Sequence, residues 1–161
     1  MAPHTKHLFE SPASAQTLAE GLAEYFACNP ALKRDSSLVS SEARQFFRSH
    51  DAVHVVYGCS TTMPDEAIVK LVSLLGTTGG LRVLRGYLHH ETLDIYRSLP
   101  IGSTALALVL APFLVVRTIW RCSRQRQRWP WEQFDHLLNV PLRDIRAQFG
   151  ITVAHAARSA A

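Results

Sequence analysis

The order of hydrophobic and polar positions is most regular over residues 51–88, where it predicts a strand, a helix and a second strand. Residues 52–57 are rich in valine and end at Gly58, which is typical of a short strand buried on both faces. Thr62 and Pro64 then form a combination typical of a helix start. The apolar positions that follow recur at helical spacing, at Ile68, Leu71, Val72 and Leu75.

A second short apolar run, residues 81–85, completes this pattern. It follows Gly76, which we expect to be a left-handed helix cap, and the Gly79-Gly80 pair, which we expect to reverse the chain. A strand, a helix and a strand of these lengths join as a βαβ unit with a right-handed crossover. We therefore predict an α/β fold, with residues 52–57 and 81–85 as parallel neighbours in a sheet flanked by helices.

The first part of the chain predicts a helical arm. Residues 1–40 contain a helical pattern that stops at Asn29-Pro30 and a polar, serine-rich loop after it. We assign residues 41–161 to the α/β domain, which opens with a short helix over residues 42–47. Because residues 1–10 carry charged side chains and no long apolar run follows them, we expect no secretory signal.

The last part of the chain predicts two further helices and a strand. Residues 131–139 have a helical pattern, and Pro141 opens a last helix that Gly150 caps. Residues 151–153 are all β-branched, and we expect them to form a brief final strand.

The uncharged stretch over residues 98–116 has two interpretations. As a helix it would be roughly 28 Å long, just enough to cross a bilayer, and arginines and a tryptophan follow it. Alternatively, residues 105–111 are a buried helix that Pro112 ends, and residues 113–120 are a strand. We favour the buried interpretation and treat residues 98–131 as an insertion in the domain. The alternative is a protein anchored in a membrane by residues 98–120, with a cytoplasmic arginine-rich flank.

Positive charge is concentrated just after that stretch. The chain has a net charge of +4 and a sequence pI near 9.3. The candidate binding residues are Arg117, Arg121, Arg124, Arg126, Arg128, Trp129 and Trp131. Interleaved arginine and tryptophan can bind an acidic protein surface or an anionic membrane, and they can also stack on bases. We favour the first two over nucleic acid, and the alternative, which we favour over all three, is a solvated basic turn whose tryptophans close the core.

The cysteines predict neither disulfide chemistry nor a metal centre. Cys28, Cys59 and Cys122 are far apart and none lies in a Cys-x-x-Cys pair, so a dithiol couple and a closed zinc site are both disfavoured. His89 and His90 are adjacent, whereas a helical metal pair needs a spacing of three or four. We found no catalytic constellation, so we expect no metal, no cofactor and no enzymatic activity.

Two blocks of the sequence resemble a known family. Cys59-Ser60, Met63-Pro64 and Arg85-Gly86 lie in the first block, and the second runs from Pro141 to Gly150 and the residues after it. These blocks are similar to the TrbC-like pilin-assembly proteins of F-type conjugative transfer systems, and together they cover about half the chain. Family members carry a signal peptide, which we do not expect here, and residues 98–131 have no counterpart in the family.

The resemblance implies a fold and a role. The implied fold is thioredoxin-like, and the implied role is non-enzymatic assembly of a conjugative pilus within a type IV secretion system. Partners would then be proteins of that assembly machine, and the implied compartment is the periplasm.

Overall fold

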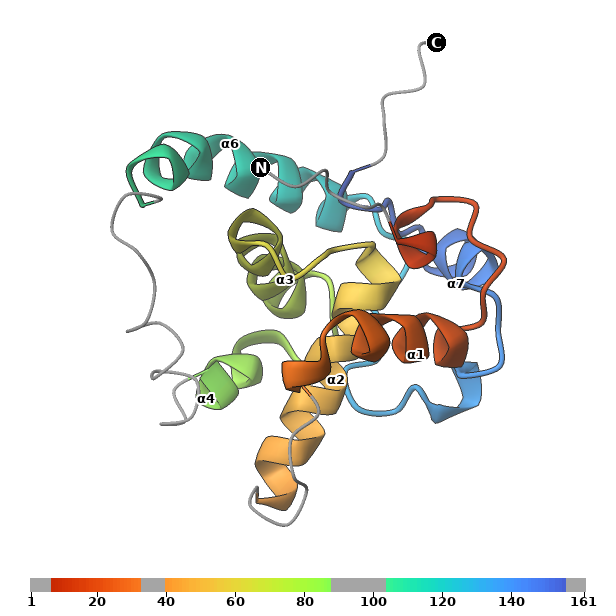
Figure 1. Ribbon diagram of the computed structural model, residues 1–161. Coiled ribbons are helices and arrows are strands. Elements are labelled where there is room, and N and C mark those ends of the chain that lie inside the picture. The colour runs from red at the N-terminus through yellow and green to blue at the C-terminus, as the bar shows by residue number, and fades with distance from the viewer. Residues whose placement is uncertain (1–6, 33–39, 88–103, 156–161) are drawn as a thin grey trace, which may run out of the picture.

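The computed structural model describes residues 7–32, 40–87 and 104–155, and within them the protein is helical. Figure 1 shows the arrangement of the helices. They are α1 (Leu18–Cys28), α2 (Ser41–Tyr57), α3 (Met63–Leu75), α4 (Val83–Tyr87), α6 (Thr104–Ser123) and α7 (Leu142–Phe149). Short 3-10 turns lie at Leu8–Glu10, Pro30–Leu32, Gly80–Arg82 and Asp135–Leu137.

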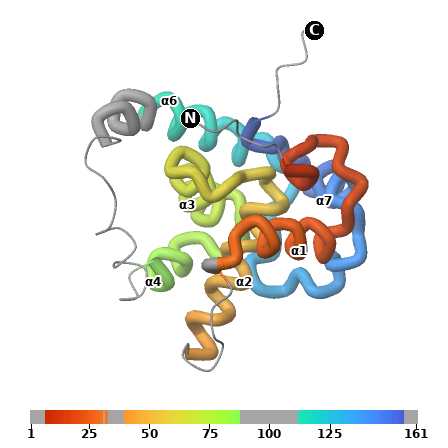
Figure 2. The backbone as a smooth tube through the Cα atoms, viewed as in Figure 1, coloured from red at the N-terminus to blue at the C-terminus, as the bar shows by residue number. Residues whose placement is uncertain are grey.

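Helix α2 is the centre of the fold. It packs against α1, α3, α4 and α7, and α3 in turn packs against α6, so α3 lies between α2 and α6. The backbone tube shows α6 running along the upper edge of the molecule and α7 on the opposite side from α4 (Figure 2). One hydrophobic core includes Leu18 and Tyr25 of α1 together with the end of α2, so the predicted arm over residues 1–40 shares its core with the rest of the described chain.

The predicted α/β, thioredoxin-like fold is wrong for the part of the chain that the structure describes, which contains no β-strand and no sheet. Residues 52–57 are the last turns of α2, and residues 81–85 lie in a 3-10 turn and α4. The reason is burial on every side. Ala52, Val53, Val55 and Val56 are all fully buried because other segments surround the end of α2. Consecutive buried positions occur in a strand and in a central helix alike, and periodicity does not separate the two.

Other predicted elements also proved wrong. The predicted strand over residues 113–120 is part of α6, which continues through Pro112 instead of ending there. Residues 151–153 form no strand, and the predicted helix over residues 131–139 is reduced to a 3-10 turn. No helix in the described ranges is long and apolar enough to cross a membrane.

Three predicted helices are confirmed, and the first is α1, which ends at Cys28, directly before the predicted stop at Asn29-Pro30. Helix α3 has Pro64 in its first turn and ends at Leu75, as its apolar stripe indicated. Helix α7 begins after Pro141 and ends at Gly150, whose φ of +70° is the left-handed conformation that favours glycine. Gly76 also ends its helix as predicted, but its conformation is right-handed.

One buried cation joins segments that are distant in the sequence. Arg146 of α7 is only 4% exposed. Its guanidinium donates hydrogen bonds to the carbonyls of Val55 (3.0 Å) and Val56 (2.9 Å) in the last turn of α2. It also donates to the carbonyls of Phe9 (2.5 Å) and Ser11 (2.6 Å) in the N-terminal segment. Helix ends expose such carbonyls without intrahelical donors, so Arg146 satisfies the end of α2 and fixes two other segments to it.

Replacing Arg146 should therefore destabilise the whole fold. We expect Arg146→Met to lower the free energy of unfolding by about 2–4 kcal/mol, because several buried carbonyls lose their donor. Urea unfolding followed by circular dichroism measures this change. Arg143→Met is the matched control, since Arg143 lies on the same helix with its side chain 56% exposed and should change stability by less than about 0.5 kcal/mol. Equal effects of the two substitutions would contradict the assigned role.

Candidate metal centre

Two histidines of α2 and one glutamate of α3 converge between these helices. His50 and His54 are four positions apart in a helix and therefore share a face. Glu66 lies in the first turn of α3, which packs on that face. Nε2 of His54 is 3.2 Å from one oxygen of Glu66, and Nε2 of His50 is 3.8 Å from the other. One ligand atom from each of the three residues can be chosen so that all lie within 4.8 Å of one another.

The proton on His54 is assigned by its surroundings. Its Nδ1 lies 3.3 Å from the carbonyl oxygen of Cys59 and 3.1 Å from that of Ser60. Carbonyl oxygens only accept hydrogen bonds, so Nδ1 carries the proton and donates it. In the neutral ring the lone pair is then on Nε2, which is buried without a hydrogen-bond partner of good geometry and faces Glu66.

His50 has a similar outer partner. Its Nδ1 lies 3.8 Å from a carboxylate oxygen of Asp51, while its Nε2 faces Glu66. The centre of its ring lies 6.0 Å from the centre of the Phe46 ring, with the two rings stacked, and 6.0 Å from the centre of the Tyr87 ring. Burial lowers the pKa of His50 and outweighs the opposing effect of Asp51, so the imidazole is neutral at physiological pH.

Glu66 supplies the negative charge of the cluster. Burial acts to raise the pKa of Glu66, but a hydrogen bond from a protonated His54, together with the positive charges of protonated His54 and His50 and of Lys70, lowers that pKa below its usual value. The carboxylate is therefore ionised when a positive charge lies beside it. An ionised carboxylate and a buried imidazole lone pair 3.2 Å apart repel each other unless a cation or a proton lies between them.

Asp65 fixes the start of α3 beside this cluster. The backbone N–H and the hydroxyl of Ser60 donate to one oxygen of Asp65, at 2.7 Å and 2.6 Å. His155 Nε2 lies 2.7 Å from the other oxygen. The sequence predicted a cap from Thr62 instead, but the Thr62 side chain makes no capping hydrogen bond. Asp65, the neighbour of Glu66, thus holds in place the turn whose carbonyls accept a hydrogen bond from His54.

The structure separates the predicted basic binding residues. Trp129 and Trp131 are buried in the core, as in the alternative that the sequence left open. Arg121 is half-buried and donates to the carbonyl of Ala154 at 2.8 Å. The exposed members of the set are Arg124, Arg126 and Arg128, and Arg117 is partly exposed. The set is therefore one exposed group of arginines and two tryptophans that belong to the core.

The residues that carried the family resemblance do not form one site. Cys59 is buried and Ser60 binds Asp65, whereas Met63 and Pro64 start α3. Arg85 and Gly86 lie on α4, and Pro141 and Gly150 flank α7.

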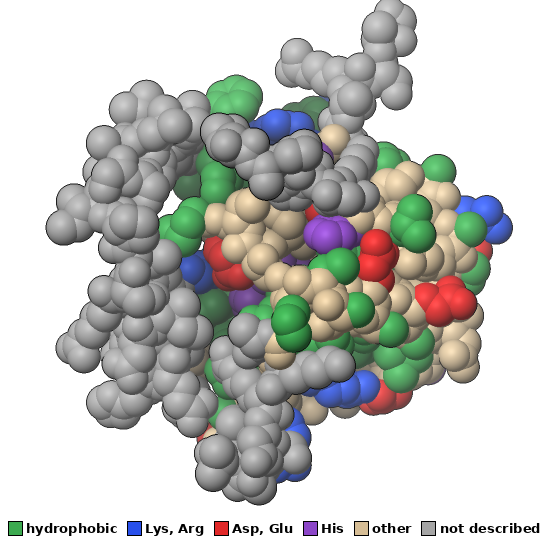
Figure 3. Space-filling model, in the orientation of Figure 1, with side chains coloured by type: hydrophobic (Ala, Val, Ile, Leu, Met, Phe, Trp, Pro, Cys, Tyr) green, Lys and Arg blue, Asp and Glu red, His purple; other side chains and the backbone are tan. Residues whose placement is uncertain are grey.

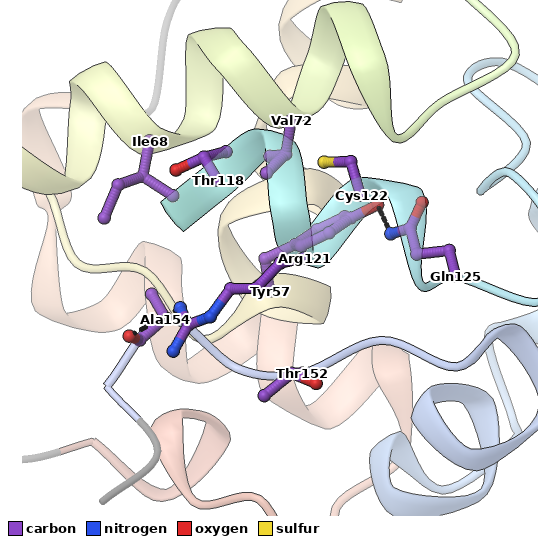
Figure 4. Close-up of a pocket in the computed structure, with 9 residues that line it drawn as sticks. All are labelled: Tyr57, Ile68, Val72, Thr118, Arg121, Cys122, Gln125, Thr152 and Ala154. Carbon is purple, nitrogen blue, oxygen red and sulfur yellow. Dashed lines mark hydrogen bonds between the residues drawn. The ribbon is translucent and has the colours of Figure 1, made fainter. Parts of the chain in front are cut away.

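A small cavity lies between the end of α2, α3, α6 and the C-terminal segment (Figure 4). Tyr57 projects into it, where its hydroxyl accepts a hydrogen bond from Gln125 Nε2 at 2.6 Å and donates to the carbonyl of Gly76 at 3.2 Å. The cavity measures about 10 Å³, close to what one water molecule requires. This cavity is too small for an organic ligand.

Comparison of the chain with protein-family models, curated proteins and solved structures found no match.

Sequence reasoning did not identify His50, His54 or Glu66 as a group. In the predicted strand, His54 fell among buried valines and had no spacing relation to His50. The signal was present as a four-residue spacing of two histidines with an acid twelve positions later. It acquires meaning only once residues 41–57 are recognised as a helix, where the same spacing puts both rings on one face.

The environments of the three cysteines predict unequal reactivity. Cys59 is fully buried, and burial raises the pKa of its thiol well above the usual value. Burial also raises the pKa of Cys122 to about 11, whereas Cys28 is exposed. In the folded protein we expect Ellman's reagent to label one thiol rapidly, and Cys28→Ser to remove that phase. Rapid labelling of a second thiol in the Cys28→Ser variant would contradict these environments.

Proposed function

We propose that this protein binds a divalent transition-metal ion, with Zn²⁺ as the best fit, between His50, His54 and Glu66. The observation that carries the proposal is the buried Nε2 of His54, which faces the carboxylate of Glu66 at 3.2 Å while its Nδ1 proton is committed to backbone carbonyls. A metal ion satisfies both groups at once, because it accepts the imidazole lone pair and neutralises the carboxylate.

The ligand chemistry supports this choice of ion. Two imidazoles and a carboxylate suit Zn²⁺, whose bonds to nitrogen and oxygen are about 2.0–2.2 Å long. The two Glu66 distances of 3.2 Å and 3.8 Å are close to the separations of roughly 3.3–3.6 Å that tetrahedral ligands at those bond lengths require. The two distances run to different oxygens of Glu66, and the three ligand atoms, which lie within 4.8 Å of one another, would have to move closer together to share one ion.

The outer partners of both histidines also fit a metal centre. Metal-binding histidines commonly donate their second ring N–H to a carbonyl or a carboxylate, which fixes the tautomer and the ring direction. Here the backbone carbonyls after Gly58 serve His54, and Asp51 faces Nδ1 of His50. The sequence alone offered no reason to expect a metal site, because these relations depend on the helical structure of α2.

Access to the centre is from the His50 and Glu66 side. The His54 side chain is fully buried, whereas those of His50 and Glu66 are 14% and 28% exposed. The described residues supply three ligands, a number that leaves a coordination position for water or an oxygen atom of a small molecule. A zinc ion in such a site can act as a Lewis acid, so the proposal places any chemistry at this centre and not at the cysteines.

The competing state is a protonated His54 paired with Glu66. In that state the cluster is an internal ion pair that stabilises the contact between α2 and α3 and has no affinity for metal.

The pilus-assembly role that the family resemblance implied is not carried forward, because it came with a thioredoxin-like fold that the described residues do not form.

The proposal predicts one high-affinity metal site per chain. After treatment with EDTA, the protein should bind one equivalent of Zn²⁺ in a competition titration against a chromophoric chelator. Glu66→Gln and His54→Ala should each weaken binding by at least about 100-fold because each removes a ligand, and Asp51→Asn should weaken it by about 10-fold because it removes an outer partner. Zn²⁺ should also raise the melting temperature of the wild-type protein, but not that of Glu66→Gln.

The controls separate metal binding from general damage. His136→Ala removes an exposed histidine elsewhere and should leave the affinity unchanged. Glu66→Gln keeps the size of a partly exposed side chain, and circular dichroism shows whether each variant is folded. Failure of the wild-type protein to bind Zn²⁺, or equal affinity in folded Glu66→Gln, would show that the cluster is only an ion pair.

A further inference from the structure

Helix α6 presents large apolar side chains to solvent on one face. Phe113, Val116, Ile119 and Trp120 are 65%, 66%, 49% and 54% exposed. Spacings of three and four place them along one side of the helix. Thr118, on the opposite side, is buried where α6 packs on α3. A contiguous row of this kind is typical of a binding surface, whereas single exposed apolar residues are common on any protein.

Cations border this apolar face, and α6 itself carries no acidic residue. Arg117 lies on α6 beside Phe113 and Trp120 on the helical wheel, and the guanidinium of Arg124 lies 4.2 Å from the centre of the Trp120 ring. The sequence has no acidic residue between Asp94 and Glu132. In the space-filling view, hydrophobic and basic side chains appear along the upper edge of the molecule, over α6 (Figure 3).

We propose that α6 docks this protein on the surface of an anionic lipid bilayer. Phe113, Val116, Ile119 and Trp120 would enter the boundary between headgroups and acyl chains, with the helix lying along the surface. Arg117 and Arg124 would remain at the level of the anionic headgroups. An amphipathic helix with aromatic residues on its apolar face and arginines beside it has the composition of helices that bind in this way.

The charges favour a bilayer over a second copy of the chain. A symmetric dimer formed through this face would place its own arginines near those of the other copy, in a stretch that offers them no acidic partner. An anionic lipid surface supplies the missing negative charge and receives the apolar row at the same time. This proposal uses no residue of the candidate metal centre, so either can fail without the other.

Trp120 provides a direct probe of insertion. The chain has three tryptophans, and Trp129 and Trp131 are buried at 0% and 6% exposure. Only Trp120 should therefore respond when the protein binds vesicles. We expect its emission to shift to shorter wavelength and to be quenched by lipids brominated near the headgroup. Trp120→Phe should bind with a similar affinity but lose both signals.

The decisive experiment is co-sedimentation of the full chain with vesicles. Binding to phosphatidylcholine vesicles containing phosphatidylglycerol should exceed binding to pure phosphatidylcholine and should weaken as salt is added. The double variant Val116→Asp, Ile119→Asp should bind anionic vesicles at least about tenfold more weakly. Reversing Arg117 and Arg124 to Glu should cost at least about fivefold for each position.

Leu81→Asp is the matched control. Leu81 is a 79% exposed apolar residue outside α6, so the one negative charge added there, against two in the double variant, should leave vesicle binding nearly unaltered. Equal binding by the Val116→Asp, Ile119→Asp variant and the wild-type protein would overturn the proposal. Absence of binding to anionic vesicles would also overturn it, as would concentration-dependent dimerisation that this double variant abolishes, which would identify a second copy as the occupant.

Discussion

The described fold depends on how the C-terminal end of α2 is satisfied. A buried helix end is costly because its last carbonyls lack intrahelical donors and water cannot reach them. Arg146 supplies donors from α7 to Val55 and Val56, and the backbone N–H of Ala154 supplies one to the carbonyl of Tyr57. Both donors come from the last third of the chain. The N–H groups of Gly58 and Cys59 serve the carbonyls of His54 and Val55 locally, whereas those of Val56 and Tyr57 accept from these distant segments.

The same helix end builds the candidate metal centre. Gly58 leaves α2 in the left-handed conformation, and a Cβ at that position would lie 3.1 Å from Val153 and 3.3 Å from the backbone of Glu10. This tight turn directs the carbonyls of Cys59 and Ser60 back toward His54 Nδ1. The interaction that ends the helix thus also sets the tautomer of a candidate ligand. Residues 54–60, all of which are buried, therefore serve both the fold and the proposed site.

The sequence predicted those elements whose signals are local. Helices α3 and α7 have a Pro near the start, a Gly at the end and one apolar stripe, and each of these signals acts within a few residues. The end of α2 has no stripe because it is buried all round, so its valines resembled a strand. Arg146 was not predicted either, since an arginine on a short amphipathic helix is usually solvated and only the tertiary fold shows that carbonyls surround it. The metal candidate was missed for the reason that α2 was missed.

The position of α3 between α2 and α6 has a geometric consequence for the two proposals together. Packed helices lie about 8–10 Å apart, axis to axis. If α6 lies in a bilayer surface, the interface of α2 and α3 that holds His50, His54 and Glu66 is kept at a fixed height, about one to two helix diameters above the lipid. Ile68 and Val72 of α3 are buried, and closely packed interiors of this kind resist compression. The metal would then face only those molecules that can reach that height from the membrane plane or from solution.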